Sequence, residues 1–457
     1  MLKLSVHIKV LSKYLLAAIL LAIPLYPKFP LLNIPGTFVA IRLEDILLLA
    51  AATLTLFSII ENRAKYAKNE LTGSIVLYLA ICSLSLFMAI FVLQTVVPHI
   101  GILHVLRRIE YFFAFFFAVE TLSRNPKALG YYLKLILLII GIATFYGAGQ
   151  RYFNFPIIIT QNEEYSKGLA LRYVSGSHIN STFAGHYDLA SFLVLTLPIV
   201  VSTFFIAKGR ASKIFTAFTF IIGLWLLAST ASRISFLSYM IAVSWTMFLI
   251  RRIRMLPIIL IVSIAFIGTS SNLIARYSRV IEVYWSKYIG YMDGNNNFSI
   301  DVYAQDALDK MDPILTPSPT SLPTPVIEDR STNIRLSVEW PRALRAFLKN
   351  PLLGTGVSSI TLATDNDYLR LLGETGMLGF LAFALIIYRV VFAFYQSFPL
   401  TKNLSGVELI FVSGVFGALP GVLLNAVFID LFEASKFAII FWLLIGLTYA
   451  LVRNAKK

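Results

Sequence analysis

Charged residues are scarce in this chain of 457 residues, and cysteine is almost absent. Only 14% of the residues are Asp, Glu, Lys or Arg, against 58% hydrophobic residues, whereas a soluble globular protein carries charge at about a quarter of its positions. The single cysteine, Cys82, excludes an intramolecular disulfide and a cysteine-based metal site. The shortage of charge excludes an ordinary soluble domain.

The chain contains several long apolar segments with few or no charged residues. The segment from Gly73 to Val97 contains no charged residue, and roughly 20 apolar residues cross the hydrocarbon core of a bilayer as a helix. Similar runs recur along the chain, so we expect an all-α polytopic membrane protein with about 12 transmembrane helices. The predicted spans lie near residues 14–27, 39–60, 74–97, 102–122, 131–149, 187–206, 214–231, 234–250, 255–269, 372–396, 407–427 and 435–452.

Basic residues cluster in every second connection between these spans. Connections rich in Lys and Arg stay in the cytoplasm, so we expect a multi-pass protein of the cytoplasmic (inner) membrane with both termini in the cytoplasm. The net charge of +15 is then a topology signal, and we expect no nucleic-acid partner. The clusters are Arg63/Lys65/Lys68, Arg124/Lys127, Lys208/Arg210/Lys213, Arg251/Arg252/Arg254, Arg389/Lys402 and Arg453/Lys456/Lys457.

Two long connections are then predicted to be external. The first nine spans occupy residues 1–269 and include an external loop near 150–186. A large external loop, 270–371, separates the ninth span from the tenth, and residues 372–457 hold the last three spans. We therefore divide the chain at this large loop.

The large loop contains two segments of different character. A Pro/Thr/Ser-rich linker over 313–329 continues neither a helix nor a sheet. It is followed by a segment whose apolar residues recur at helical spacing. We expect an amphipathic helix over 331–349, bent near Pro341 and lying on the outer leaflet in contact with membrane lipids.

Several arginines are predicted on the outer side, against the topology bias. Arg233 lies in a connection too short to hold it in bulk water, and Arg335 and Arg342 lie on the predicted surface helix. A planar guanidinium binds two phosphate oxygens at once, so we predict that these three arginines bind a pyrophosphate group. For Arg335 the alternative is a local ion pair with Glu339, four positions on.

The stretch from Gly354 to Phe380 is unusually polar for a segment that runs into a span. A plain connector needs only a few turn residues, so we expect this stretch to meet a polar substrate at the membrane surface. Asp365 is the first candidate for a general base, and Asp367 is the second. The alternative for Asp365 is an Asx turn or an N-cap to a helix that begins near Tyr368.

Histidines supply a further candidate for proton transfer. His186 opens the sixth predicted span beside Asp188 and is able to move a proton near neutral pH. Four histidines are predicted on the outer side, but their spacing is not that of metal ligands on one helical turn. We expect no metal and no cofactor. The four are His99, His104, His178 and His186.

The order of these motifs resembles that of the O-antigen ligase and polymerase family of bacterial envelope glycosyltransferases. The resemblance covers most of the chain, and its last two segments are the most specific. The matching segments are "IRLEDILLL", "STFAGHYDLASFLVLTLP", "TASRISFLS", "WPRALRAFLKNPLLGTG" and "DNDYLRLLGETGMLGF".

The resemblance implies a glycosyl transfer on the outer face of the membrane that needs no metal. The donor is a glycan on an undecaprenyl-pyrophosphate carrier, and the acceptor is a sugar hydroxyl of a second glycan or glycolipid. Motif by motif, Arg233 and Arg335 correspond to arginines that hold the pyrophosphate. Asp365 occupies the position of the family's proposed catalytic histidine in its "HN-x-Y-L" pattern, which departs from the histidine type of ligase.

A secondary transporter or a lipid-linked glycan flippase is the alternative function. About 12 spans are also typical of such proteins, which often consist of two similar halves with a site at the midplane of the membrane. The predicted external insertion between the ninth and tenth spans breaks this symmetry. The sequence therefore favours the glycosyltransferase.

Overall fold

The computed structural model describes most of the chain as helix. The described residues are 2–27, 29–33, 40–61, 69–155, 178–270, 273–274, 277–278, 285, 333–361 and 363–454. The predicted linker 313–329, the first basic cluster around Lys68 and most of the predicted loop 150–186 lie outside these ranges.

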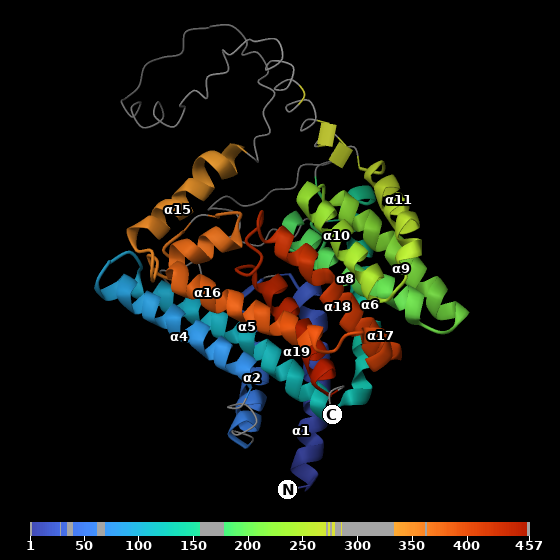
Figure 1. Cartoon of the computed structure of the whole chain (residues 1–457), viewed down its shortest axis with the longest axis horizontal. Coiled ribbons are helices and arrows are strands. Elements are labelled where there is room, and N and C mark those ends of the chain that lie inside the picture. Colours follow the sequence, from blue (N-terminus) through green and yellow to red (C-terminus); the bar gives the residue numbers. More distant parts are fainter. Residues whose placement is uncertain are drawn as a thin grey trace.

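Every predicted span overlaps a helix of the structure (Figure 1). Short 3-10 turns, η1 (Pro126–Ala128) and η2 (Ile253–Met255), precede two of the helices, and a π-helical segment, η3 (Arg335–Glu339), precedes another. The helices are α1 (Leu2–Leu25), α2 (Leu43–Glu61), α4 (Glu70–Phe91), α5 (Pro98–Arg124), α6 (Leu129–Tyr152), α8 (His186–Ile206), α9 (Arg210–Ser229), α10 (Arg233–Leu249), α11 (Leu256–Ile267), α15 (Trp340–Lys349), α16 (Asp367–Tyr395), α17 (Leu400–Asn403), α18 (Gly406–Asn425) and α19 (Ser435–Asn454).

Nine helical segments of the described ranges are long and apolar enough to cross a membrane. They comprise α1, α2, α4, α6 with its preceding turn, α8, α9, α16, α18 and α19. Two further apolar helices, α10 and α11, are shorter, and α5 carries charged residues in its first half. The structure thus supports a multi-pass helical membrane protein, while the number of about 12 crossings stays a prediction.

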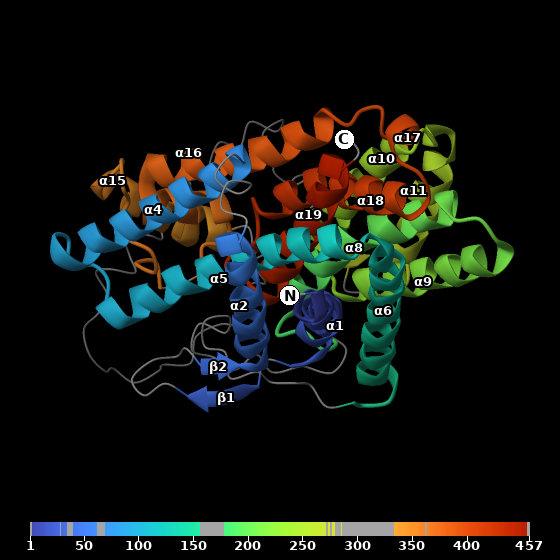
Figure 2. The same ribbon diagram turned by 90° about the horizontal axis from the view of Figure 1, so that it is seen from below.

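A short hairpin shifts the start of the second predicted span. β1 (Pro30–Asn33) pairs antiparallel with β2 (Ala40–Arg42), and α2 follows directly at Leu43 rather than at residue 39 (Figure 2). The N–H of Arg42 donates to Asp45 Oδ2 at 2.8 Å, which satisfies a backbone donor at the start of the helix. Residues 40–42 are extended because they pair with β1, so the helix begins only after them.

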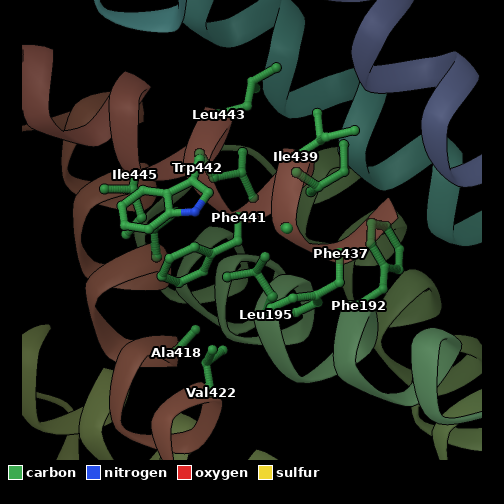
Figure 3. Close-up of a cluster of buried hydrophobic side chains, with 14 of the residues drawn as sticks. Phe192, Leu195, Ala418, Val422, Phe437, Ile439, Phe441, Trp442, Leu443 and Ile445 are labelled. Carbon is green, nitrogen blue, oxygen red and sulfur yellow. The ribbon is translucent and has the colours of Figure 1, made fainter. Parts of the chain in front are cut away.

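The core forms where the helices α8, α10 and α18 meet. α8 packs against α10 and α18, and α10 also packs against α18. Aromatic and aliphatic side chains of α19 complete this core beside α8 and α18 (Figure 3), as Phe437 and Phe441 show next to Phe192. Burial of such large side chains contributes about 1.5–3 kcal/mol each in a soluble protein. In a membrane, close packing takes over part of this role.

A second group of helices consists of α4, α5, α16 and α19. α5 packs along α19, and α4 packs against both α5 and α16, while α15 lies on the first part of α16 (Figures 1 and 2). The connection from α18 to α19, residues 426–434, joins the two groups. The polar residues described below gather around this connection.

α16 is not a continuous helix, because its backbone breaks at Gly376. This residue has φ 65° and ψ −168°, a left-handed conformation that glycine adopts without strain. The N–H of Met377 donates to the carbonyl of Pro351 at 2.8 Å, and the N–H of Gly356 donates to the carbonyl of Glu374 at 2.9 Å. The segment 350–356 thus supplies the hydrogen bonds that the break removes from the helix.

Candidate functional site

A pocket lies between the beginnings of α8 and α10. Tyr187 of α8, Arg233 of α10, Arg335 of η3 and two residues of the α18–α19 connection form its wall. It therefore joins two of the three predicted pyrophosphate-binding arginines, although their positions in the sequence are far apart. The full lining is Tyr187, Ser232, Arg233, Ile234, Arg335, Phe428 and Ile429.

The local structure at this pocket favours an anion. Both α8 and α10 begin here, and the first turn of a helix presents backbone N–H groups with a partial positive charge. At α10, the side chain of Ser232 caps the helix and accepts from the N–H of Ser235 at 3.4 Å. Two arginine side chains add full positive charges to those helix ends. The arrangement suits a phosphate or pyrophosphate group.

Arg335 is oriented by a carboxylate from the polar stretch. Its Nε and Nη2 atoms donate to Asp365 Oδ2 at 3.1 and 2.9 Å. Burial alone would lower the pKa of Arg335, but Asp365 and Tyr187 beside it raise this pKa, so the guanidinium stays charged. Arg335 thus forms an ion pair with Asp365. The alternative predicted from the sequence was an ion pair with Glu339, four positions on in the same helix.

The π-helical geometry of η3 explains this choice of partner. The N–H of Trp340 donates to the carbonyl of Arg335, five residues back, and Pro341 follows with no N–H to donate. A π-turn rotates side chains away from the positions that they take in an α-helix, where residues four apart face each other. The change of helix type falls just before Pro341, and the bend near this proline stays a prediction.

Asp365 itself lies in a tight turn before α16. Its φ of 49° is left-handed, and 27% of its side chain is exposed, so a substrate is able to reach the carboxylate. The helix begins at Asp367, and its N-cap is Asn366, whose Oδ1 accepts from the N–H of Leu369 at 3.0 Å. The structure assigns the cap to Asn366, so the side chain of Asp365 is not used for capping.

Asp367 is placed differently from Asp365. Its Oδ2 accepts from the N–H of Leu431 at 2.7 Å and from the N–H of Phe432 at 3.2 Å. The residue is buried, and it lines a second, aromatic cavity instead of the arginine pocket. These contacts fix the backbone of the α18–α19 connection.

The remaining predicted site residues lie at different distances from the pocket. The ring of His186 contacts that of Tyr187 in a tilted arrangement, with centroids 4.0 Å apart, and that of His178 at 4.4 Å. His186 is thus one residue from the pocket wall. Arg342 lies on α15, partly exposed, and does not line the pocket.

A buried cluster of ion pairs joins α5, α16 and the α18–α19 connection. This cluster was not predicted from the sequence. Arg108 Nη2 donates to Glu374 Oε2 at 2.8 Å and to Glu433 Oε1 at 2.6 Å. Arg370 contacts Glu374 Oε1 at 3.3 Å and Asp430 Oδ2 at 3.1 Å. The sequence signals were Arg108 and Glu374, which are charged residues inside predicted spans, and two acids, Asp430 and Glu433, in a short connection between spans.

The two arginines keep Glu433 ionised. Burial alone would raise the pKa of Glu433, but Arg108 and Arg370 beside it lower this pKa to about 2. Glu433 therefore stays a carboxylate at neutral pH. A buried charge is tolerated only when it is paired and hydrogen-bonded, and Arg108 meets this condition with two carboxylates.

The described part of the chain contains no group of three or more His, Cys, Asp and Glu side chains that could hold a metal ion. The side chains that meet at the arginine pocket supply positive charge and hydrogen-bond donors instead. They suit the binding of a charged leaving group.

A comparison with protein families matches this region of the chain. Residues 218–384 match the family model described as O-antigen ligase. The match runs from α9 into α16 and includes Arg233, Arg335 and Asp365, while His186 and the α18–α19 connection lie outside it. A comparison with curated proteins finds no match.

Proposed function

We propose that the arginine pocket of this chain binds the pyrophosphate of a lipid-linked saccharide donor, because residues 218–384 match the O-antigen ligase family model. The family match supports an O-antigen ligase-type membrane glycosyltransferase in general. The proposed donor is an undecaprenyl-pyrophosphate-linked glycan, and the proposed acceptor is a sugar hydroxyl on a glycan or glycolipid. The observation that carries this proposal is the meeting of Arg233 and Arg335 at the starts of α8 and α10.

In this reaction the protein mainly positions the donor and the acceptor and stabilises the negative charge of the leaving pyrophosphate. The bond between the acceptor oxygen and the anomeric carbon forms while the bond from that carbon to the pyrophosphate oxygen breaks. The pyrophosphate leaves with the electron pair and is stabilised by the two guanidinium groups. Holding donor and acceptor in line supplies much of the remaining rate enhancement. The acceptor proton passes to a base as the new bond forms.

Asp365 is the proposed base, and its contact with Arg335 suggests how it becomes available. In the described structure Arg335 donates to the Asp365 carboxylate. A bound pyrophosphate competes for the same guanidinium, and charge-assisted bonds to phosphate are strong. Once Arg335 turns to the pyrophosphate, its positive charge lowers the basicity of the carboxylate less, and Asp365 becomes a better proton acceptor. His186, whose ring contacts that of Tyr187, is the second candidate.

We expect Asp365→Asn to lower turnover by about 10²–10⁴-fold, because the amide cannot take the acceptor proton. Binding of undecaprenyl pyrophosphate should change little, since both arginines remain. The measurement is saccharide transfer in proteoliposomes, together with binding of undecaprenyl pyrophosphate. Asp365→His, which restores the family's residue, should recover part of the activity.

A suitable control is Glu120→Gln, which breaks an ion pair with Arg124 at the other end of α5. Its turnover should equal that of the wild type. Turnover of Asp365→Asn within a few-fold of wild type would reduce Asp365 to a partner of Arg335, and His186→Ala would then be the variant to measure. A transporter or flippase is not favoured by the family match.

The proposed chemistry also requires the pocket to face outward. The basic connections place Lys208, between α8 and α9, in the cytoplasm, whereas Arg345 on α15 is predicted outside; both are exposed. In a Cys82→Ala background, a membrane-impermeant maleimide should label Arg345→Cys in intact cells and Lys208→Cys only after permeabilisation. The reverse pattern would invert the orientation and place the pocket in the cytoplasm.

A further inference from the structure

We infer that Asp430 is a positioning residue for the Asp365 carboxylate; this inference rests on the proposed function. Asp430 Oδ2 accepts from the N–H of Thr364 at 2.9 Å, and its Oδ1 accepts from the N–H of Asn366 at 2.9 Å. The two amides that flank Asp365 thus point at one carboxylate. Successive backbone N–H groups around a left-handed residue form a concave anion site, and here the anion is a side chain of the protein.

The contact is reciprocal. The N–H of Asp367 donates to the carbonyl of Ala426 at 2.9 Å, and the carboxylate of Asp367 accepts from the N–H of Leu431 at 2.7 Å. Each of two turns, residues 364–367 and residues 426–432, therefore offers a carboxylate to the backbone amides of the other. We call this arrangement the double clamp. It fixes the two turns against each other at both ends.

The double clamp holds the backbone of Asp365 in a left-handed conformation. Its φ of 49° belongs to the left-handed region, which is less favourable than the right-handed region for a residue with a Cβ. Such a conformation persists where the surroundings impose it. The same clamp encloses Phe428 and Ile429, which line the arginine pocket. Through Asp430, the clamp fixes the position of Asp365 relative to this connection.

Asp430 acts through its neighbours, because it does not line the arginine pocket. Behind it, Arg370 Nη1 donates to Asp430 Oδ2 at 3.1 Å, and Arg370 Nη2 donates to the carbonyl of Ile360 at 3.0 Å. Arg370 is itself held by Glu374. The orientation of Asp430 is thus fixed by buried side chains that do not line the arginine pocket.

The test is Asp430→Asn, which keeps the size of the side chain but turns an amide N–H₂ toward one of the two backbone donors. We expect turnover to fall roughly 10–10²-fold, the effect of a small misplacement of a reacting group. Binding of undecaprenyl pyrophosphate should stay within about three-fold of wild type, because Arg233 and Arg335 are untouched. A purely structural role would instead change binding and turnover together.

The double variant separates this inference from the proposed function. Adding Asp430→Asn to Asp365→Asn should cost no further turnover, because the effect of Asp430 passes through Asp365. Losses that multiply, or a single Asp430→Asn variant with wild-type turnover, would overturn the inference while leaving the role of Asp365 intact. If Asp365→Asn alone retained wild-type turnover, the proposed role of Asp365 would fail, and the inference with it.

Folding is checked by thermal unfolding in one detergent. Glu120→Gln serves as the matched control, since it also neutralises a carboxylate paired with arginine. Should Asp430→Asn fail to fold, Arg370→Lys is the second variant. It keeps the positive charge but loses the planar fork that contacts Asp430 and Ile360, and it should show the same split between turnover and binding. Equal loss of binding and turnover in Arg370→Lys would contradict the positioning role.

Discussion

Arg335→Ala is expected to weaken binding of undecaprenyl pyrophosphate by about 2–5 kcal/mol, because a desolvated phosphate would lose its charged partner. The same substitution removes the group that holds Asp365 Oδ2 through two hydrogen bonds. Turnover should therefore fall further than binding. We expect Arg233→Ala to weaken binding by a similar amount, since Arg233 lines the same pocket.

Lysine variants separate charge from geometry at this pocket. Arg335→Lys keeps the positive charge but loses the planar fork, so it should recover only part of the lost binding. Arg342→Ala and Arg345→Ala, on α15, are the controls and should bind as the wild type does. The measurement is binding of undecaprenyl pyrophosphate to each purified form in one detergent. Equal binding by the wild type, Arg233→Ala, Arg335→Ala and Arg335→Lys would remove the pyrophosphate site from this pocket.

Gly376→Ala should be the most damaging single substitution for the fold of α16. A Cβ at this position would lie 2.3 Å from the carbonyl oxygen of Leu352, which is backbone and has no rotamer to change. The φ of 65° adds roughly 1–2 kcal/mol of strain for any residue with a Cβ. Either the segment 350–356 moves away, or the break in α16 closes. Both outcomes remove the hydrogen bonds of Met377 and Gly356.

The measurement is the midpoint of thermal unfolding in detergent, with the yield of monodisperse protein as a second readout. Gly141→Ala is the matched control, because an added Cβ on this glycine of α6 meets nothing within 4 Å. Alanine is favoured over glycine in a helix by about 1 kcal/mol, so this control should be neutral or stabilising. A Gly376→Ala variant as stable as Gly141→Ala would show that the break in α16 is not required.

The helices were predictable because each apolar span carries its own signal. A run of about 20 apolar residues must form a helix in a bilayer wherever the rest of the chain lies. The β1–β2 hairpin was missed for the opposite reason. Residues 40–42 are extended through pairing with residues 30–33, and a pairing between segments leaves little mark in the sequence of either one.

The same distinction applies to the candidate site. The chemistry of single residues pointed to Arg233, Arg335 and Asp365, and the structure brings Arg335 and Asp365 into contact. The partner of Arg335 was harder to predict, because helical spacing favoured Glu339 and a π-turn changes that spacing. The role of Asp430 depends on the meeting of two turns, which no local pattern in the sequence reports.

The ion pairs of Arg108 also constrain the order in which the chain is built into the membrane. Arg108 lies about 15 Å along α5 from its first residue, and its two carboxylate partners follow 266 and 325 residues later in the chain. An unpaired arginine at membrane depth is costly, and synthesis proceeds from the N-terminus. Arg108 therefore acquires its two carboxylate partners only after α16 and Glu433 have been synthesised. The first half of α5 lacks these ion pairs until translation reaches the connection before α19.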